Sequence, residues 1–465
     1  MQDILATLPK GLSADGSPFS AVRPMTLDQL HALVAWANDT RCPIVPVSSS
    51  GGRHGMGAWS QGAVIADMSG MQRIIQVDAQ DSVAIIEPGV TFPALDAALA
   101  PHGLRSFKPL LPRRGKSVLA SYLDREPITS PHDHWDSEDP LGGTQLVFGN
   151  GETFRTGTAA VRGTLEEQLH KGARPMMALG PASTDFLRVV QGSQGTLAIA
   201  AWASVFCEPI PARERAFFAG SDDVGPLIDL AYKILWRRLG GQLFIVNAAQ
   251  LGMIGGRDAK SRAALSDGLP RWILYANLTC PDYFPDERMA YLVADIEADA
   301  AALGLSIGEA IAGYAAADIA NQQSDLPALH YKDRPGGLCR SLFFLTQMDR
   351  APVFLDVLDA ILADHRDIAP SFGVYLQPRI QGVSAHFEVV IPFDPRVKPG
   401  DERIDRLIGH VASRLADAGA FFSRPYDPWT NIAFEKDPTI RPYLAAVKEL
   451  MDPKGILSPG RLCFP

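Results

Sequence analysis

A loop rich in glycine and serine, Ser48 to Gly57, constrains the fold of this chain more than any other stretch. The apolar run Ile44 to Val47 leads into it, and a second apolar run, Val64 to Met68, follows it. Glycine permits positive φ and lets the backbone approach a ligand closely. Successive backbone N–H groups in such a turn form a concave anion site. We therefore predict a strand–loop–strand unit that binds a pyrophosphate, with a plain surface loop as the alternative.

The side chains of this loop suit the same ligand. Arg53 and His54 add positive charge to the backbone donors, and three consecutive serines supply hydroxyl groups. The residues expected to bind a cofactor that carries this pyrophosphate are Pro46, Ser48, Ser49, Ser50, Gly51, Gly52, Arg53, His54 and Gly55.

Length and composition limit the class of protein. At 465 residues the chain is longer than a domain with a single hydrophobic core usually is, so two domains are expected. The net charge is -9 and the basic residues form no polybasic run, which argues against a nucleic-acid partner. No apolar run approaches the roughly 18 residues that a membrane-spanning helix needs. The first residues lack the pattern of a secretion signal, so a cytoplasmic location is expected.

The cysteines and histidines give no sign of a metal centre. The five cysteines are scattered and form no Cys-x-x-Cys pair, which argues against an iron–sulfur cluster and fits a reducing compartment. His132 and His134 would point the same way along an extended chain, but a lone His-x-His pair is weak evidence for a metal. We therefore predict no metal.

The hydrophobic periodicity predicts an α+β fold of short strands and helices. Thr26, with Gln29 three residues on, indicates a capping box at the start of a helix. From about residue 224 onward, strands alternate with helices, which favours an antiparallel sheet covered by helices on one face. The strands expected there are 242–247, 272–277, 340–347, 372–377 and 384–391, and the helices are 224–237, 286–303, 351–365 and 404–418.

Several sequence blocks occur together in an order typical of one group of flavoproteins. They are Arg23-Pro24, the Gly-Gly-Arg-His-Gly-x-Gly loop, Glu87-Pro88-Gly89-Val90, Leu123-Asp124-Arg125, Gly192 to Ile199, and Met451 to Gly460. In these blocks the chain resembles the vanillyl-alcohol oxidase and para-cresol methylhydroxylase superfamily. The segment Thr129 to Trp135 resembles its phenol-oxidising branch.

The resemblance implies a two-domain flavoprotein and a set of cofactor contacts. Residues 1–211 would form an FAD-binding domain of short mixed sheets, 212–434 a substrate-binding cap with an antiparallel sheet, and 435–465 a segment returning to the first domain. FAD would lie with its pyrophosphate on the 48–57 loop, and attachment through His330 or Tyr331 is one alternative for its linkage. Further cofactor contacts implied by the resemblance are Pro88, Gly89, Ser117, Ser121, Tyr122, Asp124, His134, Gly192, Gly195 and Ile199.

The resemblance also directs attention to residues that could carry chemistry. Hydride transfer to a flavin needs a partner for the substrate proton, and histidine is a natural one. His386 lies on a predicted alternating strand and is similar to a histidine on the equivalent strand of the family; Glu388 faces the same side. Arginine presents a planar fork that suits a carboxylate or phenolate. We expect one arginine among Arg114, Arg340 and Arg379 to hold such a group.

The predicted function is that of an FAD-dependent oxidoreductase acting on an alcohol or benzylic carbon of a small aromatic substrate, as in the catabolism of aromatic compounds. The tyrosine–arginine pair that phenol oxidisers carry near the end of the chain aligns with Pro428-Trp429 here. That departure keeps two alternatives open, a 2-hydroxy-acid dehydrogenase of the lactate and glycolate type and a non-catalytic FAD-binding protein. The resemblance allows a homodimer, and oxygen, a cytochrome and a quinone remain alternatives as electron acceptor.

Overall fold

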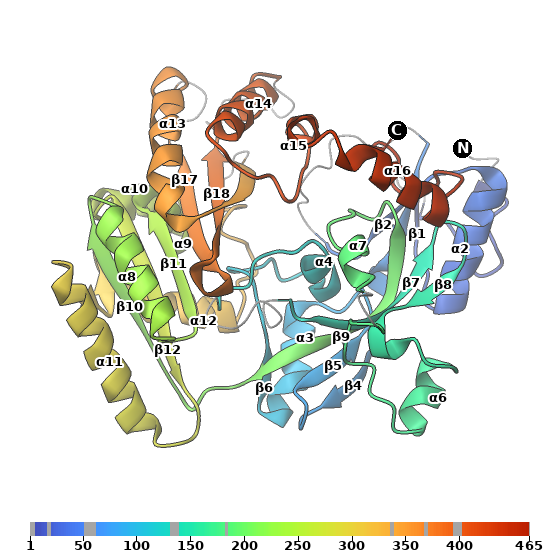
Figure 1. The fold of residues 1–465 in the computed structure, drawn as a ribbon, viewed down its shortest axis with the longest axis horizontal. Helices are drawn as coiled ribbons and strands as arrows, with labels where there is room; N and C mark the ends of the chain where they lie inside the picture. Colours follow the sequence, from blue (N-terminus) through green and yellow to red (C-terminus); the bar gives the residue numbers. More distant parts are fainter. Residues whose placement is uncertain are drawn as a thin grey trace.

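Two units of mixed helix and sheet lie side by side in the computed structural model (Figure 1), which confirms the predicted α+β class. The first unit contains the amino-terminal strands and the last helix, and the second contains one large sheet with its helices. No helix in the described part of the chain is long and apolar enough to cross a membrane. The structure describes residues 5–15, 20–50, 62–130, 139–181, 185–334, 339–366, 371–393 and 402–464.

A three-stranded parallel sheet opens the first unit and leads into the predicted cofactor loop. Its order is β1 (Ala21–Val22), β3 (Val64–Asp67) and β2 (Ile44–Val47). Helix α2 (Leu27–Thr40) packs on it through Leu30, Leu33 and Val34, which are fully buried. Half of the predicted capping box is present, because the Thr26 hydroxyl accepts a hydrogen bond from Gln29 N at 3.2 Å, while the Gln29 side chain accepts from Met25 N and not from Thr26 N.

A six-stranded antiparallel sheet completes the first unit. The long strand β9 (Ala198–Pro209) lies at its centre and pairs with three neighbours. Because β9 is buried along almost its whole length, it fixes the shorter strands and helices on either side. The remaining elements are β4 (Ile74–Asp78), β5 (Val83–Ile86), β6 (Leu104–Ser106), β7 (Leu141–Phe148), β8 (Thr153–Arg155), α3 (Phe92–Leu99), α4 (Val118–Leu123), α6 (Leu165–His170) and α7 (Leu187–Val190).

The second unit is built on a seven-stranded sheet, which we call the cap sheet. All of its strand pairings are antiparallel, as the sequence predicts. Their order is β13 (Ile307–Gly308), β10 (Arg213–Ser221), β12 (Trp272–Cys280), β11 (Gln242–Asn247), β17 (Gly373–Arg379), β18 (Ser384–Pro392) and β16 (Cys339–Thr346).

Helices cover both faces of the cap sheet, whereas the sequence indicated one. Helices α8 (Gly225–Trp236), α11 (Pro285–Ala302), α13 (Ala351–Asp364) and α14 (Glu402–Asp417) share one buried core with the outer face. Helices α9 (Ala248–Gly255) and α12 (Ala316–Ser324) pack on part of the inner face, where aromatic side chains such as Phe244 and Tyr275 must also be buried. The remaining elements are α10 (Ala259–Asp267), β14 (Ala310–Ile311) and β15 (Tyr314–Ala315).

The alternation of side chains along β18 decides which residues can reach the first unit. Phe387 and Val389 belong to the core beneath the outer helices, and Phe387 stacks on Phe344 with ring centroids 4.9 Å apart. Successive side chains of a strand point to opposite faces. His386 and Glu388 therefore face inward, toward the first unit.

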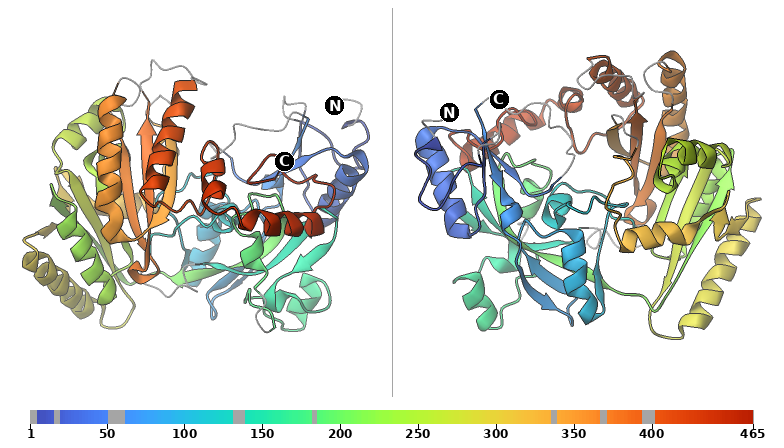
Figure 2. Two further views of the ribbon diagram at one scale, coloured as in Figure 1. Left: turned by 45° about the horizontal axis from the view of Figure 1, so that its top comes forward. Right: turned by 180° about the vertical axis from the view of Figure 1, so that it is seen from behind.

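The chain leads from β9 of the first unit to β10 of the cap sheet through residues 210–212. Helices α15 (Thr430–Lys436) and α16 (Ile440–Met451) then lead back, and α16 lies over the first unit (Figure 2). Ile44 N donates to Ile456 O at 2.8 Å, and Ser458 N donates to Ile44 O at 2.9 Å. The end of the chain thus pairs with β2, the strand that leads into the predicted cofactor loop.

Candidate cofactor and substrate site

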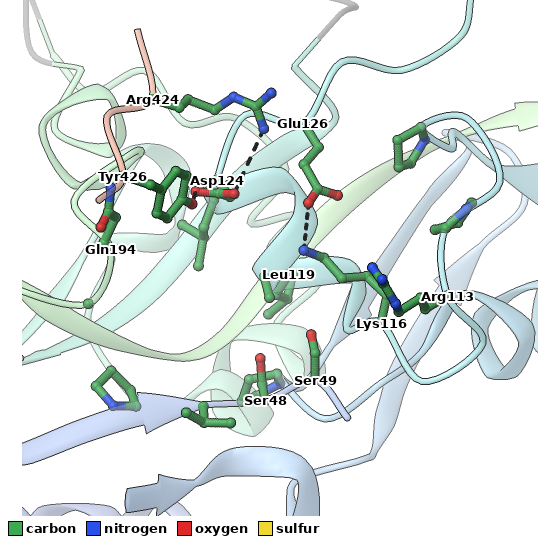
Figure 3. A pocket seen from close by; sticks show the side chains of 18 of the residues that line it. Ser48, Ser49, Arg113, Lys116, Leu119, Asp124, Glu126, Gln194, Arg424 and Tyr426 are labelled. Carbon is green, nitrogen blue, oxygen red and sulfur yellow. Dashed lines mark hydrogen bonds and ion pairs between the residues drawn. The ribbon is translucent and has the colours of Figure 1, made fainter. Parts of the chain in front are cut away.

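A cavity of about 350 Å³ lies between the two units and takes side chains from both (Figure 3). This volume is within the range of small-molecule and cofactor sites. The predicted cofactor residues that line it are Pro46, Ser48, Ser49, Ser50, Pro88, Asp124, Gly195 and Ile199.

The start of the cofactor loop is held by the turn before α4. Ser50 N donates to Gly115 O at 2.9 Å, and Ser117 N donates to Ser49 Oγ at 2.9 Å. A Cβ at Gly115 would lie only 1.8 Å from Ser50 Oγ, so the serine hydroxyl would have to turn away to make room for a larger residue. The loop thus leaves β2 with serine hydroxyls against the cavity wall, a donor set that fits a phosphate-bearing cofactor.

The other predicted cofactor residues have different positions. Five support the turns around the cavity without lining it: Gly89, Ser117, Ser121, Tyr122 and Gly192. The Ser117 hydroxyl, for example, donates to Pro88 O at 2.6 Å, and the Tyr122 hydroxyl donates to Phe107 O at 2.6 Å. Gly51, Gly52, Arg53, His54, Gly55 and His134 lie outside the described residues.

The inner face of the cap sheet supplies the opposite wall of the cavity. His386 and Glu388 line it from β18, and Tyr375 lies beside them on β17. Glu388 accepts a hydrogen bond from the Lys332 ammonium, which also donates to Ser341 Oγ at 3.1 Å. His386 Nε2 is 3.9 Å from Glu388 Oε2, too far for a hydrogen bond in this arrangement.

Burial and neighbouring charges determine the protonation of this wall. Burial lowers the pKa of His386 to about 4, although Glu388 opposes the shift, so the imidazole is neutral at pH 7. Burial disfavours the charged forms of Lys332 and Glu388, but the attraction between the two opposite charges outweighs this effect of burial. The pKa of Lys332 is therefore raised, and that of Glu388 lies well below its usual range. The wall thus carries a neutral imidazole next to a buried ion pair.

His330 and Tyr331 also line the cavity, and both use their polar atoms within the protein. His330 Nε2 donates to Leu111 O at 2.9 Å, and its Nδ1 accepts from Lys332 N at 3.2 Å. Burial lowers the pKa of His330 to about 3. The Tyr331 hydroxyl accepts a hydrogen bond from Gln250 Nε2 at 3.4 Å, and burial raises its pKa to about 12.

A second charged cluster joins the end of α4 to the segment before α15 (Figure 3). Glu126 accepts from Lys116 Nζ at 2.6 Å and from Ser121 Oγ at 2.7 Å. Burial disfavours the Glu126 anion, but Lys116 outweighs it and lowers the pKa of Glu126 to about 2. Asp124 accepts a hydrogen bond from the Tyr426 hydroxyl and lies near Arg424; burial raises the pKa of Asp124, against the effect of that arginine.

The three predicted anion-binding arginines do not line the cavity. Arg114 donates to Leu326 O at 2.6 Å and is exposed, Arg340 is exposed on β16, and Arg379 ends β17. The cations that do line it include Arg424 and Arg461, which our sequence reasoning missed. The signal was present, because a tyrosine and an arginine, Tyr426 and Arg424, lie just upstream of the aligned Pro428-Trp429.

The two buried histidines predict a loss of stability toward acid. The unfolded-chain pKa of 6.5 exceeds the folded values of about 4 for His386 and about 3 for His330. The unfolded state therefore binds more protons below pH 6.5, and the stabilisation present above that pH is lost as the pH falls toward 4 and then 3. Each histidine should contribute up to about 1.4 kcal/mol per pH unit. Denaturant titrations between pH 7 and pH 5 test this: His386→Gln should lose less stability than the wild type, and an identical slope would contradict it.

Comparison with known proteins agrees with this geometry. Residues 18–157 match the family described as FAD binding domain. The chain is 28% identical over 169 residues to the flavoprotein subunit of 4-cresol dehydrogenase [hydroxylating] of Pseudomonas putida, covering 34% of this chain and 31% of that protein. It is 21% identical over 481 residues to a D-2-hydroxyglutarate dehydrogenase of Stutzerimonas stutzeri, covering 96% and 91%. The first curated relatives are matched over only 31% to 54% of their length.

Solved structures share the fold over nearly the whole chain. A 4-ethylphenol oxidase from Gulosibacter chungangensis superposes with a TM-score of 0.78 at 17% identity, covering 97% of this chain and 91% of that one. Substrate-bound p-cresol methylhydroxylase superposes with a TM-score of 0.73 at 18% identity, covering 96% and 88%. These relatives and neighbours are FAD-dependent oxidases and dehydrogenases. Residues 18–157 thus match an FAD binding domain, and the chain as a whole shares the fold of 4-ethylphenol oxidase and p-cresol methylhydroxylase.

Proposed function

We propose that the protein is an FAD-dependent oxidoreductase that removes a hydride from an alcohol or benzylic carbon of a small aromatic substrate. When bound, FAD supplies the hydride acceptor at its N5 atom. The observation that carries the proposal is the neutral imidazole of His386, which faces the same cavity as the start of the cofactor loop. A base that is unprotonated at pH 7 can accept the proton that the substrate loses with the hydride.

Each part of the cavity wall has a role in this proposal. The serines of residues 48–50 and the backbone at Gly195 hold the cofactor, and His386 takes the substrate proton. The Lys332–Glu388 pair fixes the charge behind His386. The rings of Phe343, Tyr375 and Tyr426 line the cavity and suit an aromatic substrate. Arg424 and Arg461 present planar forks to an acidic group on that substrate.

The same arginines favour a second candidate, the oxidation of a 2-hydroxy acid. The substrate carboxylate would occupy the position at Arg424 and Arg461 that a phenolate occupies in the first proposal. The relative with the longest coverage quoted above is a D-2-hydroxyglutarate dehydrogenase. Both candidates use His386 in the same way, so they differ in the substrate and not in the base.

The hydrogen bonds of His330 and Tyr331 favour non-covalent binding of FAD over attachment to either residue. Attachment to His330 would break a hydrogen bond at one of its two ring nitrogens, and attachment to Tyr331 would displace Gln250. We expect the yellow flavin to leave the polypeptide when the holoprotein is precipitated with acid. Flavin that stays with the pellet would contradict this linkage, and a protein that takes up no FAD would overturn the proposed function.

The choice between the substrates needs an anaerobic single-turnover experiment. The FAD-loaded protein is mixed with 4-alkylphenols, benzyl alcohols and D-2-hydroxy acids, and bleaching of the flavin absorbance is followed by stopped flow. Bleaching by the aromatic compounds supports the first proposal, and bleaching by hydroxy acids alone supports the second. If no compound bleaches a flavin that dithionite does reduce, both proposals fail in favour of a non-catalytic FAD-binding protein.

A further inference from the structure

The cations that line the cavity differ in how closely a carboxylate neutralises them. Lys116 Nζ lies 2.6 Å from Glu126, Arg113 Nη2 lies 2.8 Å from Asp333, and Lys332 is in direct contact with Glu388. These three are hydrogen-bonded ion pairs. Arg424 is different, because its Nη1 is 3.8 Å from Asp124 Oδ2, which is beyond hydrogen-bond length.

Other contacts fix the position of Arg424. Its guanidinium lies over the ring of Phe343, 4.1 Å from the ring centroid. The next residue, Pro425, accepts a hydrogen bond at its carbonyl from Gln194 Nε2. Only 7% of the Arg424 side chain is exposed, and in the described part of the chain it donates no hydrogen bond. The guanidinium is thus held by its stacking and its backbone, with N–H groups available to a ligand in the cavity.

Asp124 acts on this site from two directions. Its Oδ1 accepts the hydrogen bond of the Tyr426 hydroxyl, while its Oδ2 faces Arg424 at the longer distance. Its side chain is 17% exposed and lines the same cavity. A carboxylate so placed lowers the positive potential that an incoming anion meets at Arg424. It does so without being the contact that holds the guanidinium.

We propose that Asp124 determines specificity by limiting how strongly the Arg424 end of the cavity binds an anionic group. The inference deepens the proposed function and rests on it, since the anion is the acidic group of the substrate. With Asp124 ionised, the pair Asp124–Arg424 carries no net charge, so its attraction for an anionic group is weaker than that of Arg424 alone. Removing that one negative charge should make the cavity bind anions more tightly.

The test compares benzoate binding by the FAD-loaded wild type and Asp124→Asn, measured by isothermal titration calorimetry. Asparagine keeps an oxygen that can accept the Tyr426 hydrogen bond and loses only the charge. We expect benzoate to bind about tenfold more tightly to Asp124→Asn, since one pK unit of interaction is tenfold in affinity. Arg424→Gln should weaken binding. Equal or weaker binding by Asp124→Asn, or no benzoate binding by either protein in the millimolar range, would overturn the inference.

A matched control separates the local effect from a change in overall charge. Asp325→Asn removes the same charge from a residue whose side chain is 92% exposed and whose partner, Arg114, lies outside the cavity wall. It should leave benzoate affinity unchanged, and an equal gain would overturn the inference. Asp124→Ser, also neutral, is the second variant in case Asp124→Asn folds poorly, with the same expected direction. Loss of FAD uptake by the wild type would instead refute the proposed function.

Discussion

Replacing His386 with glutamine should slow reduction of the bound flavin by at least about 100-fold, the lower end of what a general base contributes. The side chain faces the cavity from β18, and burial keeps its pKa near 4, so the wild-type imidazole is ready to accept a proton at neutral pH. Glutamine is similar in size and polar, but it cannot take up a proton at pH 7. Anaerobic stopped flow with the best substrate measures the effect, and titration with FAD checks that cofactor binding is unchanged.

The control for this variant is a second histidine that has no role at the cavity. His410 lies exposed on α14, so His410→Gln should reduce the flavin at the wild-type rate. A His386→Gln enzyme that also matches the wild type would refute the base assignment. The carboxylate of Glu388 or Asp124 would then be the next candidate, since both line the same cavity.

Replacing Lys332 with methionine should lower the free energy of unfolding by about 3 to 5 kcal/mol, the usual effect of removing one partner from a buried ion pair. Glu388 would be left 8% exposed with its charge uncompensated. The double variant Lys332→Met/Glu388→Gln should recover most of the lost stability, because the unpaired charge of Glu388 causes more of the loss than the missing contact does. Urea unfolding followed by tryptophan fluorescence measures all three proteins.

The comparison between the single and double variants separates the effect of the Glu388 charge from the effect of packing around Lys332. If Lys332→Met alone is as stable as the wild type, the pair is not held in the buried geometry described above. If the double variant is no more stable than Lys332→Met, packing around Lys332 and not the charge of Glu388 accounts for the loss. In the proposed function Lys332 also keeps Glu388 ionised. Lys332→Met should therefore raise the pKa of Glu388, and the rate of flavin reduction should begin to fall at a higher pH as the solution is made more acidic.

Local patterns in the sequence predict the elements of this fold well. The capping hydrogen bond between Thr26 and Gln29 depends on residues three apart, and the alternation along β18 depends on neighbours. Such patterns also indicate that His386 and Glu388 share one face of a strand.

The charged part of the cavity could not be predicted in the same way. Asp124 and Tyr426 are 302 residues apart, and only the docking of the two units brings them together. Local sequence does not determine whether an arginine side chain faces a cavity or solvent, which is why Arg340 was expected at the site and Arg424 was not. The family resemblance directed attention to residues 428–429, whereas the arginine and tyrosine at the cavity come from residues 424–426.

The pairing of residues 456–458 with Ile44 has a consequence for how the protein is made. A ribosome releases the amino-terminal strands first, while the strand partner that completes the edge of β2 is synthesised almost last. The cap can gather its own strands and helices in the interval, since they are contiguous in the chain. The nucleotide pocket should therefore mature after the cap, and nascent chains stalled before residue 440 should capture FAD poorly even though every serine of the loop has already been translated.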